Sequence, residues 1–279
     1  MPRGPPAGLH CGSLVTPVCV DIDAVLDSLE RLASQRPVAA RIVATTNNDR
    51  SSAAELATVL GADVALAAKV MKLANSAYFG LSGRVTSLQL AVTVVGFNTV
   101  RSVATVALAG IDGTEGLPEG FWTTSLHLAA AAGTLGPLFQ TGTGDALSLG
   151  LLAQLGAALL FQADPEGYAA IVAGTELGTG RFAAETQRYG ITSAQLTAEA
   201  LQQWRFPSGM VDALRAVQGG EEGALLRTAY ELAARLIHPR HSSVPLERLC
   251  GHRVTENQAA VRLAAIRADV EALQHALEL

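Results

Sequence analysis

The chain has 279 residues and a formal net charge of −5, with 49% hydrophobic but only 5% aromatic residues. This length is enough for one large domain or two small ones with a buried core, and the negative charge argues against non-specific binding of nucleic acid phosphates. Alanine and leucine dominate, and most apolar residues recur at helical spacing, so the sequence predicts an all-α fold.

Three local features of the sequence bear on targeting and on the redox compartment. Residues 1–14 are rich in proline and glycine and lack the continuous apolar core of a signal peptide, so we expect a disordered lead-in. Cys11, Cys19 and Cys250 show neither metal-ligand spacing nor a disulfide framework, which indicates a reducing cytoplasm. The apolar stretch 147–161 is shorter than the roughly 20 residues that cross a bilayer, so it predicts a buried core helix.

The first 110 residues predict a series of short helices joined by tight turns. Each start carries a residue suited to an N-terminus: Asp21, Pro37, Ser52, Asp63, Ser87 and Asn98. The helix from Asp21 carries an apolar stripe of Val25, Leu26, Leu29 and Leu32. Gly61 and Gly96 mark helix ends, and we expect Gly61 to adopt the left-handed conformation.

A glycine-rich joint at residues 111–120 separates these helices from a second helical group. Further helices are predicted over residues 121–139, 145–161, 165–176, 181–189, 192–204, from 207 onward, over 221–237 and over 255–279. Thr192 and Gln195 form a capping-box pattern at the start of one of them. The short joint predicts that the two groups pack as one unit.

The most informative stretch is residues 63–80. Leu66, Val70 and Leu73 fall on one helical face, and Lys72 lies in the last turn, where a cation suits the helix dipole. The helix then gives way to Asn75-Ser76, whose side chains bond readily to nearby backbone.

An aromatic pair, Tyr78-Phe79, follows and is closed by the turn residue Gly80. We expect the Asn75 amide to be paired with backbone. Adjacent rings after a helix do not easily both face inward, so one should be buried and the other partly exposed. Phe79 is the better candidate for burial because it has no hydroxyl to satisfy.

The amino-acid sequence of this region resembles that of a known family. Leu-Ala-Asn-Ser-Ala-Tyr-Phe-Gly at 73–80, a short loop, and Ser-Leu-Gln-Leu-Ala-Val-Thr-Val-Val-Gly-Phe at 87–97 resemble the HDOD family of bacterial signalling domains. The resemblance implies an HDOD-like domain over residues 15–219, with an N-terminal helical bundle at 15–110 and a degenerate HD-like bundle at 118–219. Residues 220–279 then form a C-terminal helical extension.

HDOD domains are relatives of HD phosphohydrolases, whose histidines and aspartates hold catalytic metal ions. The segment 150–156, Gly-Leu-Leu-Ala-Gln-Leu-Gly, resembles the one that carries the histidine–aspartate pair, and here that pair reads Ala153-Gln154. Three further ligand positions correspond by resemblance to Thr124, Ser193 and Gln218. Because metal-activated hydrolysis needs converging, deprotonated ligands, we expect no catalytic residues, no metal and no cofactor.

Histidines elsewhere offer weak alternatives. His127 lies one helical turn from Thr124 and is the nearest alternative ligand in these segments. His238 and His241 are close in sequence, but Pro239 predicts a loop, and no acidic or thiol residue lies within a few positions. We therefore expect a solvated loop rather than a metal site at 238–241.

The resemblance implies a non-enzymatic signal-transduction module that binds other signalling proteins in the bacterial cytoplasm, without nucleic acid or membrane partners. Two alternatives stay open. One is a metal-dependent phosphohydrolase, against which the missing ligands argue. The other is a small-ligand sensor that uses the polar residues of the degenerate pocket, although a packing role for these residues is favoured.

Overall fold

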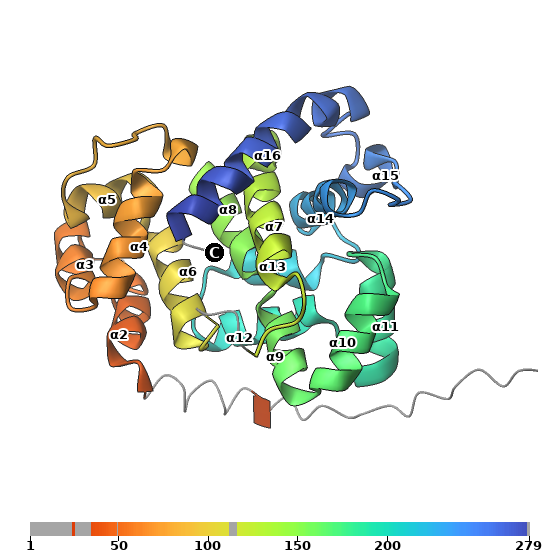
Figure 1. Ribbon diagram of the computed structural model, residues 1–279, viewed down its shortest axis with the longest axis horizontal. Helices are drawn as coiled ribbons and strands as arrows, with labels where there is room; N and C mark the ends of the chain where they lie inside the picture. Colours follow the sequence, from red (N-terminus) through yellow and green to blue (C-terminus); the bar gives the residue numbers. More distant parts are fainter. Residues whose placement is uncertain (1–23, 26–34, 49, 112–115, 278–279) are drawn as a thin grey trace, which may run out of the picture.

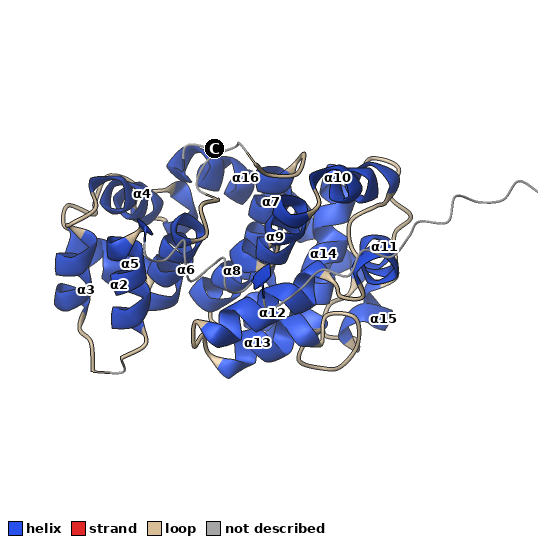
Figure 2. Ribbon diagram, turned by 90° about the horizontal axis from the view of Figure 1, so that it is seen from below, coloured by secondary structure: helices blue, strands red, loops and turns tan. Residues whose placement is uncertain are grey.

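The computed structural model describes residues 24–25, 35–48, 50–111 and 116–277, and within these ranges the regular elements are all helices. The all-α prediction is confirmed. Two views show an N-terminal group of helices beside a larger C-terminal group (Figure 1, Figure 2). The last helix, α16, runs across both groups and contacts α4 on one side and α7 on the other.

The N-terminal group forms largely as its capping residues predict. Its helices are α2 (Pro37–Thr46), α3 (Ala53–Leu60), α4 (Val64–Ala74), the 3-10 helix η1 (Ala77–Phe79), α5 (Leu88–Val95) and α6 (Phe97–Leu108). The side chains of Ser52, Asp63 and Ser87 each accept a hydrogen bond from the backbone N–H three residues on. Leu66, Val70 and Leu73 are buried on one face of α4, as expected.

Two expectations in this group are wrong. Gly61 ends α3 with φ −63°, a right-handed conformation, because Asp63 caps α4 almost at once and the chain keeps turning in the same sense. Asn98 does not cap α6, which begins at Phe97 after Gly96; its amide instead donates to the Asp145 carboxylate at 2.7 Å. Most of the predicted Asp21 helix, the lead-in 1–14, Cys11 and Cys19 lie outside the described residues.

The C-terminal group contains α7 (Phe121–Leu135), η2 (Gly136–Phe139), α8 (Thr143–Leu152), α9 (Leu155–Ala163), α10 (Pro165–Gly174), α11 (Thr179–Tyr189), α12 (Ser193–Gln203), α13 (Ser208–Arg215), α14 (Ala224–Ile237), α15 (Leu246–Cys250) and α16 (Glu256–Leu277). The capping box of Thr192 and Gln195 is present at α12. The helix predicted over 145–161 is instead two helices, α8 and α9, which meet at Ala153-Gln154.

The apolar segment that contains these two helices, Thr143–Ala163, is long and apolar enough to cross a membrane by composition alone. In the structure, 83% of its most apolar part is buried inside the protein. It therefore serves as the core of the C-terminal group, where α8 packs against α7 and α9 against α12.

Residues 75–87 form an elbow between α4 and α5, and the Asn75 side chain fixes this elbow. Its amide nitrogen donates to the carbonyls of Met71 and Val85, at 3.1 and 2.8 Å, and its oxygen accepts the Val85 N–H at 3.0 Å. Ser76 bonds back to the Leu73 carbonyl at 2.7 Å, and Gly80 closes η1 at φ +67°. The expected backbone pairing of Asn75 is present, and it reaches across the loop to Val85.

The two aromatic residues of the elbow do not divide as expected. Tyr78 and Phe79 are both half-buried, with ring centroids 5.1 Å apart in an edge-to-face arrangement. The Tyr78 hydroxyl is the more enclosed part: it faces α7 where Gly133 lacks a side chain, and it has no hydrogen-bond partner. The preference for Phe79 as the buried ring is wrong, because the missing side chain at Gly133 makes room for the tyrosine tip.

A second contact joins the two groups at Trp204, the end of α12. Its carbonyl accepts hydrogen bonds from Arg101 at 2.6 Å and from Asn47 at 3.2 Å, both in the N-terminal group. The Arg101 guanidinium also lies 3.7 Å from the centre of the Phe206 ring. Arg101 is only 3% exposed, and this burial lowers its pKa to about 10. The contact therefore ties both groups together with one buried cation.

We predict that Asn75→Ala lowers the free energy of unfolding by about 1–3 kcal/mol, because it leaves the Val85 amide and two carbonyls without their partner. Urea unfolding followed by circular dichroism measures the change. Asn257→Ala, at an exposed position in the first turn of α16, is the matched control and should change stability little. Equal stability of Asn75→Ala and wild type would contradict a structural role for the elbow.

The contact between Tyr78 and Gly133 gives a second prediction. Tyr78→Phe removes a buried hydroxyl without a partner and should raise the free energy of unfolding by about 1 kcal/mol or leave it unchanged. Gly133→Ala places a Cβ 2.0 Å from that hydroxyl and should cost about 1–3 kcal/mol. In the Tyr78→Phe background the same alanine should cost less, which a double-mutant cycle measures. Strict additivity of the two changes would show that the Tyr78 hydroxyl and the added Cβ at position 133 do not contact each other.

Candidate functional site

The candidate site centres on the turn between α8 and α9, where Ala153 and Gln154 lie. Both are buried, with 0% and 3% of their surface exposed. The Gln154 amide nitrogen donates to the Tyr230 hydroxyl at 3.0 Å, and that hydroxyl donates to the Ala153 carbonyl at 3.4 Å. Tyr230 comes from α14, so a residue of the predicted C-terminal extension completes this turn.

Two glycines allow the turn to sit deep in the protein. A Cβ on Gly150 would lie 2.3 Å from the Leu128 carbonyl oxygen of α7, and a Cβ on Gly156 would lie 2.0 Å from the Ser193 carbonyl oxygen of α12. Real Cβ atoms do not approach oxygen so closely. Because both positions are glycine, α8 packs directly on α7 and α9 on α12, and the side chains between them are enclosed.

Ser193 extends the site into a buried polar network. Its backbone N–H donates to one Glu185 carboxylate oxygen at 2.7 Å, and the Tyr168 hydroxyl donates to the other at 2.8 Å. Thr197 links this part to the α8–α9 turn: its hydroxyl accepts the Gly156 N–H at 2.8 Å and donates to the Ser193 carbonyl at 2.9 Å. The network thus runs from Gln154 to Glu185 through α9, α12 and α14.

Burial controls the electrostatics of the network. Glu185 is fully buried, and desolvation raises the pKa of its carboxyl above the ordinary value, although the Ser193 and Tyr168 hydrogen bonds and the charge of Arg181 act in the opposite direction. Burial likewise raises the pKa of the Tyr168 and Tyr230 hydroxyls, with the Glu185 charge as the next cause. These phenols therefore stay protonated and act as hydrogen-bond donors.

The structure brings together only some of the five residues predicted from the resemblance. Ala153, Gln154 and Ser193 lie in one network, as described. Thr124 is buried in the first turn of α7, and no hydrogen bond joins it to that network among the described residues. Gln218 is exposed beyond the end of α13 and has no hydrogen bond to that network among the described residues; it borders a cavity of about 310 Å³ that Tyr230 also lines.

Glu185, Tyr168 and Tyr230 were not found from the sequence. Each lies in an ordinary helical pattern, and their partners are far away along the chain: Tyr230 is 76 residues from Gln154, and Tyr168 is 17 residues from Glu185. The one available signal was the position of Glu185 between Phe182 and Tyr189 on one helical face. That signal is weak, because most helical glutamates are exposed.

Among the described residues, neither His127 nor His241 belongs to a cluster of potential metal ligands. His127 lies half-buried against the Thr123 carbonyl, and burial lowers the pKa of its ring. His241 lies in a loop, as expected, but the fold brings two acidic partners to it: Nδ1 is 2.8 Å from Glu176 and Nε2 is 3.1 Å from Glu231. The two carboxylates face opposite ring nitrogens, so they do not converge on one ion. Across the described residues, no cluster of three potential metal ligands is found.

Comparison with known families decides the identity of the fold. The sequence profile of the HDOD domain matches residues 32–219. This chain belongs to the HDOD family. The match covers most of the chain and includes the elbow at Asn75 as well as the Ala153-Gln154 turn.

Solved structures with the same fold support the assignment. A candidate phosphohydrolase from Shewanella amazonensis SB2B has a TM-score of 0.68 and 23% identity, over 91% of this chain and 98% of that one. A candidate signal transduction protein from Marinobacter aquaeolei VT8 has a TM-score of 0.67 and 20% identity, over 96% and 68% of the two chains. An HDOD domain protein of unknown function from Geobacter sulfurreducens has a TM-score of 0.63 and 16% identity, over 93% and 100%.

At these identities the likeness shows the shared fold and not a shared activity. No curated protein sequence shows a significant match to this chain.

The raised pKa of Glu185 predicts a pH dependence of stability. The native state binds a proton at Glu185 more tightly than the unfolded chain, so this residue's contribution to stability is full below the unfolded pKa of about 4.3 and falls as the pH rises through the folded pKa. Glu185→Gln cannot ionise. Its stability relative to wild type should therefore improve as the pH rises above the unfolded pKa, by up to about 1.4 kcal/mol for each unit of pKa shift.

Urea unfolding of both proteins at several pH values measures this difference. Glu271→Gln, at an exposed position on α16, is the control, and its difference from wild type should stay nearly constant. A Glu185→Gln difference that is independent of pH would show that folding does not perturb this carboxyl.

Proposed function

We propose that this chain is a non-catalytic regulatory domain that acts by binding other signalling proteins in the bacterial cytoplasm. The observation that carries the proposal is the α8–α9 turn. Where HD hydrolases place a histidine–aspartate pair, this chain has Ala153 and Gln154, and the Gln154 amide is committed to Tyr230.

The chemistry of the surrounding donors supports the same conclusion. A hydrolytic metal ion needs several deprotonated ligands around one open position. Here the carboxylate of the buried network, Glu185, accepts hydrogen bonds from the Ser193 N–H and the Tyr168 hydroxyl, and burial disfavours its charged form. The residues present at this place therefore do not fit a hydrolytic metal centre.

The two alternatives receive less support. A phosphohydrolase is suggested by the names of two proteins of similar fold, but at 23% and 18% identity these names do not transfer to this chain. A small-ligand sensor in the degenerate pocket would need free polar groups. The Gln154 amide nitrogen and the Ser193 amide are already bonded within the protein, which favours a packing role.

We predict less than about 0.1 equivalent of iron, manganese or zinc in tag-free protein, because the donor set described above lacks deprotonated, convergent ligands. Elemental analysis by mass spectrometry measures this. The same protein supplied with Mn²⁺ should not hydrolyse bis(p-nitrophenyl) phosphate above the rate of buffer with Mn²⁺ alone. About one equivalent of tightly held metal, or metal-dependent hydrolysis, would revive the phosphohydrolase interpretation.

The binding half of the proposal has its own experiment. Proteins captured on the full chain in extracts of the source organism are identified, and each candidate is purified and titrated against the chain. A saturable complex from two purified components supports the proposal. Failure of every candidate to bind directly would refute a stable protein–protein role.

A further inference from the structure

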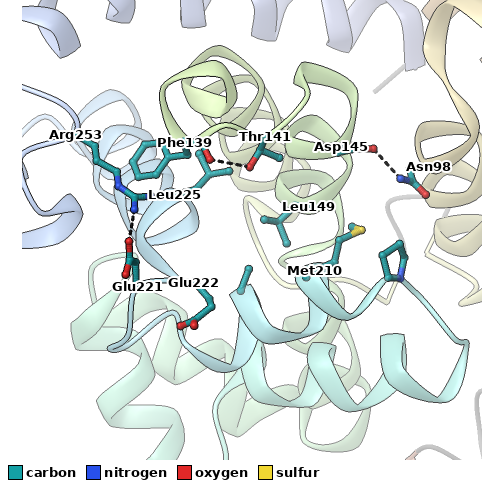
Figure 3. Close-up of a pocket in the computed structure, with 13 residues that line it drawn as sticks. Asn98, Phe139, Thr141, Asp145, Leu149, Met210, Glu221, Glu222, Leu225 and Arg253 are labelled. Atoms are coloured by element: carbon teal, nitrogen blue, oxygen red, sulfur yellow. Dashed lines mark hydrogen bonds and ion pairs between the residues drawn. The ribbon is translucent and has the colours of Figure 1, made fainter.

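A pocket lies apart from the degenerate HD-like site, between α8, α13 and the segment that precedes α14 (Figure 3). Its volume is about 510 Å³, within the roughly 300–1,000 Å³ range of small-molecule sites. Its apolar wall consists of Phe139, Leu149, Met210, Ala213 and Leu225, all at most 9% exposed. None of the five residues assigned to the degenerate site lines it.

One end of this pocket carries a single negative charge. Asp145, at the start of α8, hydrogen-bonds to the Asn98 amide at 2.7 Å. The amide is neutral, so it orients the carboxylate without compensating its charge. Figure 3 shows this pair at one end of the pocket, beyond Leu149 and Met210.

The other end also carries a net charge of about −1. Glu221 forms an ion pair with Arg253, and these two charges cancel. Glu222 lies beside them at the pocket and makes no hydrogen bond or ion pair with any residue that the structure describes. The pocket therefore has an exposed carboxylate at each end, neither of them paired with a cationic side chain among the described residues, and an apolar wall between them.

We propose that this pocket binds an elongated organic dication, a molecule with an ammonium or amidinium group at each end and an apolar middle. An anion would meet carboxylates at both ends. Arg253, the one cationic side chain among the described residues that line the pocket, is already paired with Glu221. A neutral apolar molecule would use the wall but neither end. The proposal is independent of the proposed function, because it concerns different residues and purified protein alone.

The probe for the test is 1,8-diaminooctane, compared with octylamine and 1,8-octanediol, which have the same chain length. Full-length ¹⁵N-labelled protein is titrated with each compound and followed by amide chemical shifts. We expect the diamine to shift amides at Leu149, Met210 and Leu225, and to bind about threefold more tightly than octylamine, since each exposed ion pair contributes modestly. The diol should bind most weakly. Raising the salt concentration should weaken the diamine more than the monoamine.

Three variants test whether binding of the diamine depends on the two terminal carboxylates. Glu222→Gln and Asp145→Asn each remove one terminal charge and should reduce binding of the diamine to the level of octylamine. Both are conservative, and Asn at 145 still accepts the Asn98 hydrogen bond, so folding should be preserved. Asp212→Asn is the control: it lies on α13 but outside the pocket and is exposed, and it should leave binding of the diamine unchanged.

The outcomes separate cleanly. Shifts confined to the pocket, with loss of the diamine's advantage in both Glu222→Gln and Asp145→Asn, support the proposal. Equal binding of diamine and octylamine by wild type would overturn it, as would the absence of any shift at the pocket. An effect of Asp212→Asn as large as that of Glu222→Gln would also overturn it, because it would show general attraction to an acidic surface. None of these results depends on whether the chain binds partner proteins or lacks a metal.

Discussion

The close approach of helix backbones at Gly150 and Gly156 is the constraint on which the rest of the C-terminal group depends. With no Cβ at either position, α8 rests on the α7 backbone and α9 on the α12 backbone. The turn between them is enclosed, and an enclosed polar side chain must find its partner inside the protein. The Gln154 amide nitrogen donates to the Tyr230 hydroxyl, and the Ser193 backbone N–H donates to the Glu185 carboxylate. The turn between α8 and α9 is thus part of a hydrogen-bonded core.

The two helical groups are joined by contacts of different chemistry. At the elbow, Asn75 fixes the loop to Val85, and Tyr78 inserts its tip against Gly133 of α7. At the opposite joint, the buried Arg101 guanidinium bonds the Trp204 carbonyl and stacks on Phe206. Helix α16 covers the elbow side and contacts both groups, with Asp269 accepting a hydrogen bond from Thr134. Because these contacts are buried and specific, relative movement of the groups would break several at once.

The pocket bounded by α8, α13 and the segment before α14 reaches the joint between the two helical groups. Its Asp145 is the residue to which Asn98 of the N-terminal group bonds, so one end of the pocket lies at the joint between the groups. A ligand there changes stability or conformation only by its differential affinity for two states of the protein. An effect on the contact between Asn98 and Asp145 is the most direct way in which an occupant could be sensed by the N-terminal helices.

Local interactions determined much of what the sequence alone could predict. The caps at Ser52, Asp63, Ser87 and Thr192 follow from hydrogen bonds three residues long, and the motif at residues 73–80 pointed to the HDOD family and its all-α fold. By resemblance, the sequence also predicted that Ala153-Gln154 stands where HD hydrolases carry a histidine–aspartate pair. It did not show the break between α8 and α9, because the apolar pattern of 145–161 continues through the turn. The tertiary structure alone decided that the Tyr78 hydroxyl is enclosed and which residues surround Gln154. It also decided which carboxylates without a cationic partner lie beside the apolar wall of the pocket. These depend on contacts between residues far apart in the chain, for which no local periodicity or spacing exists.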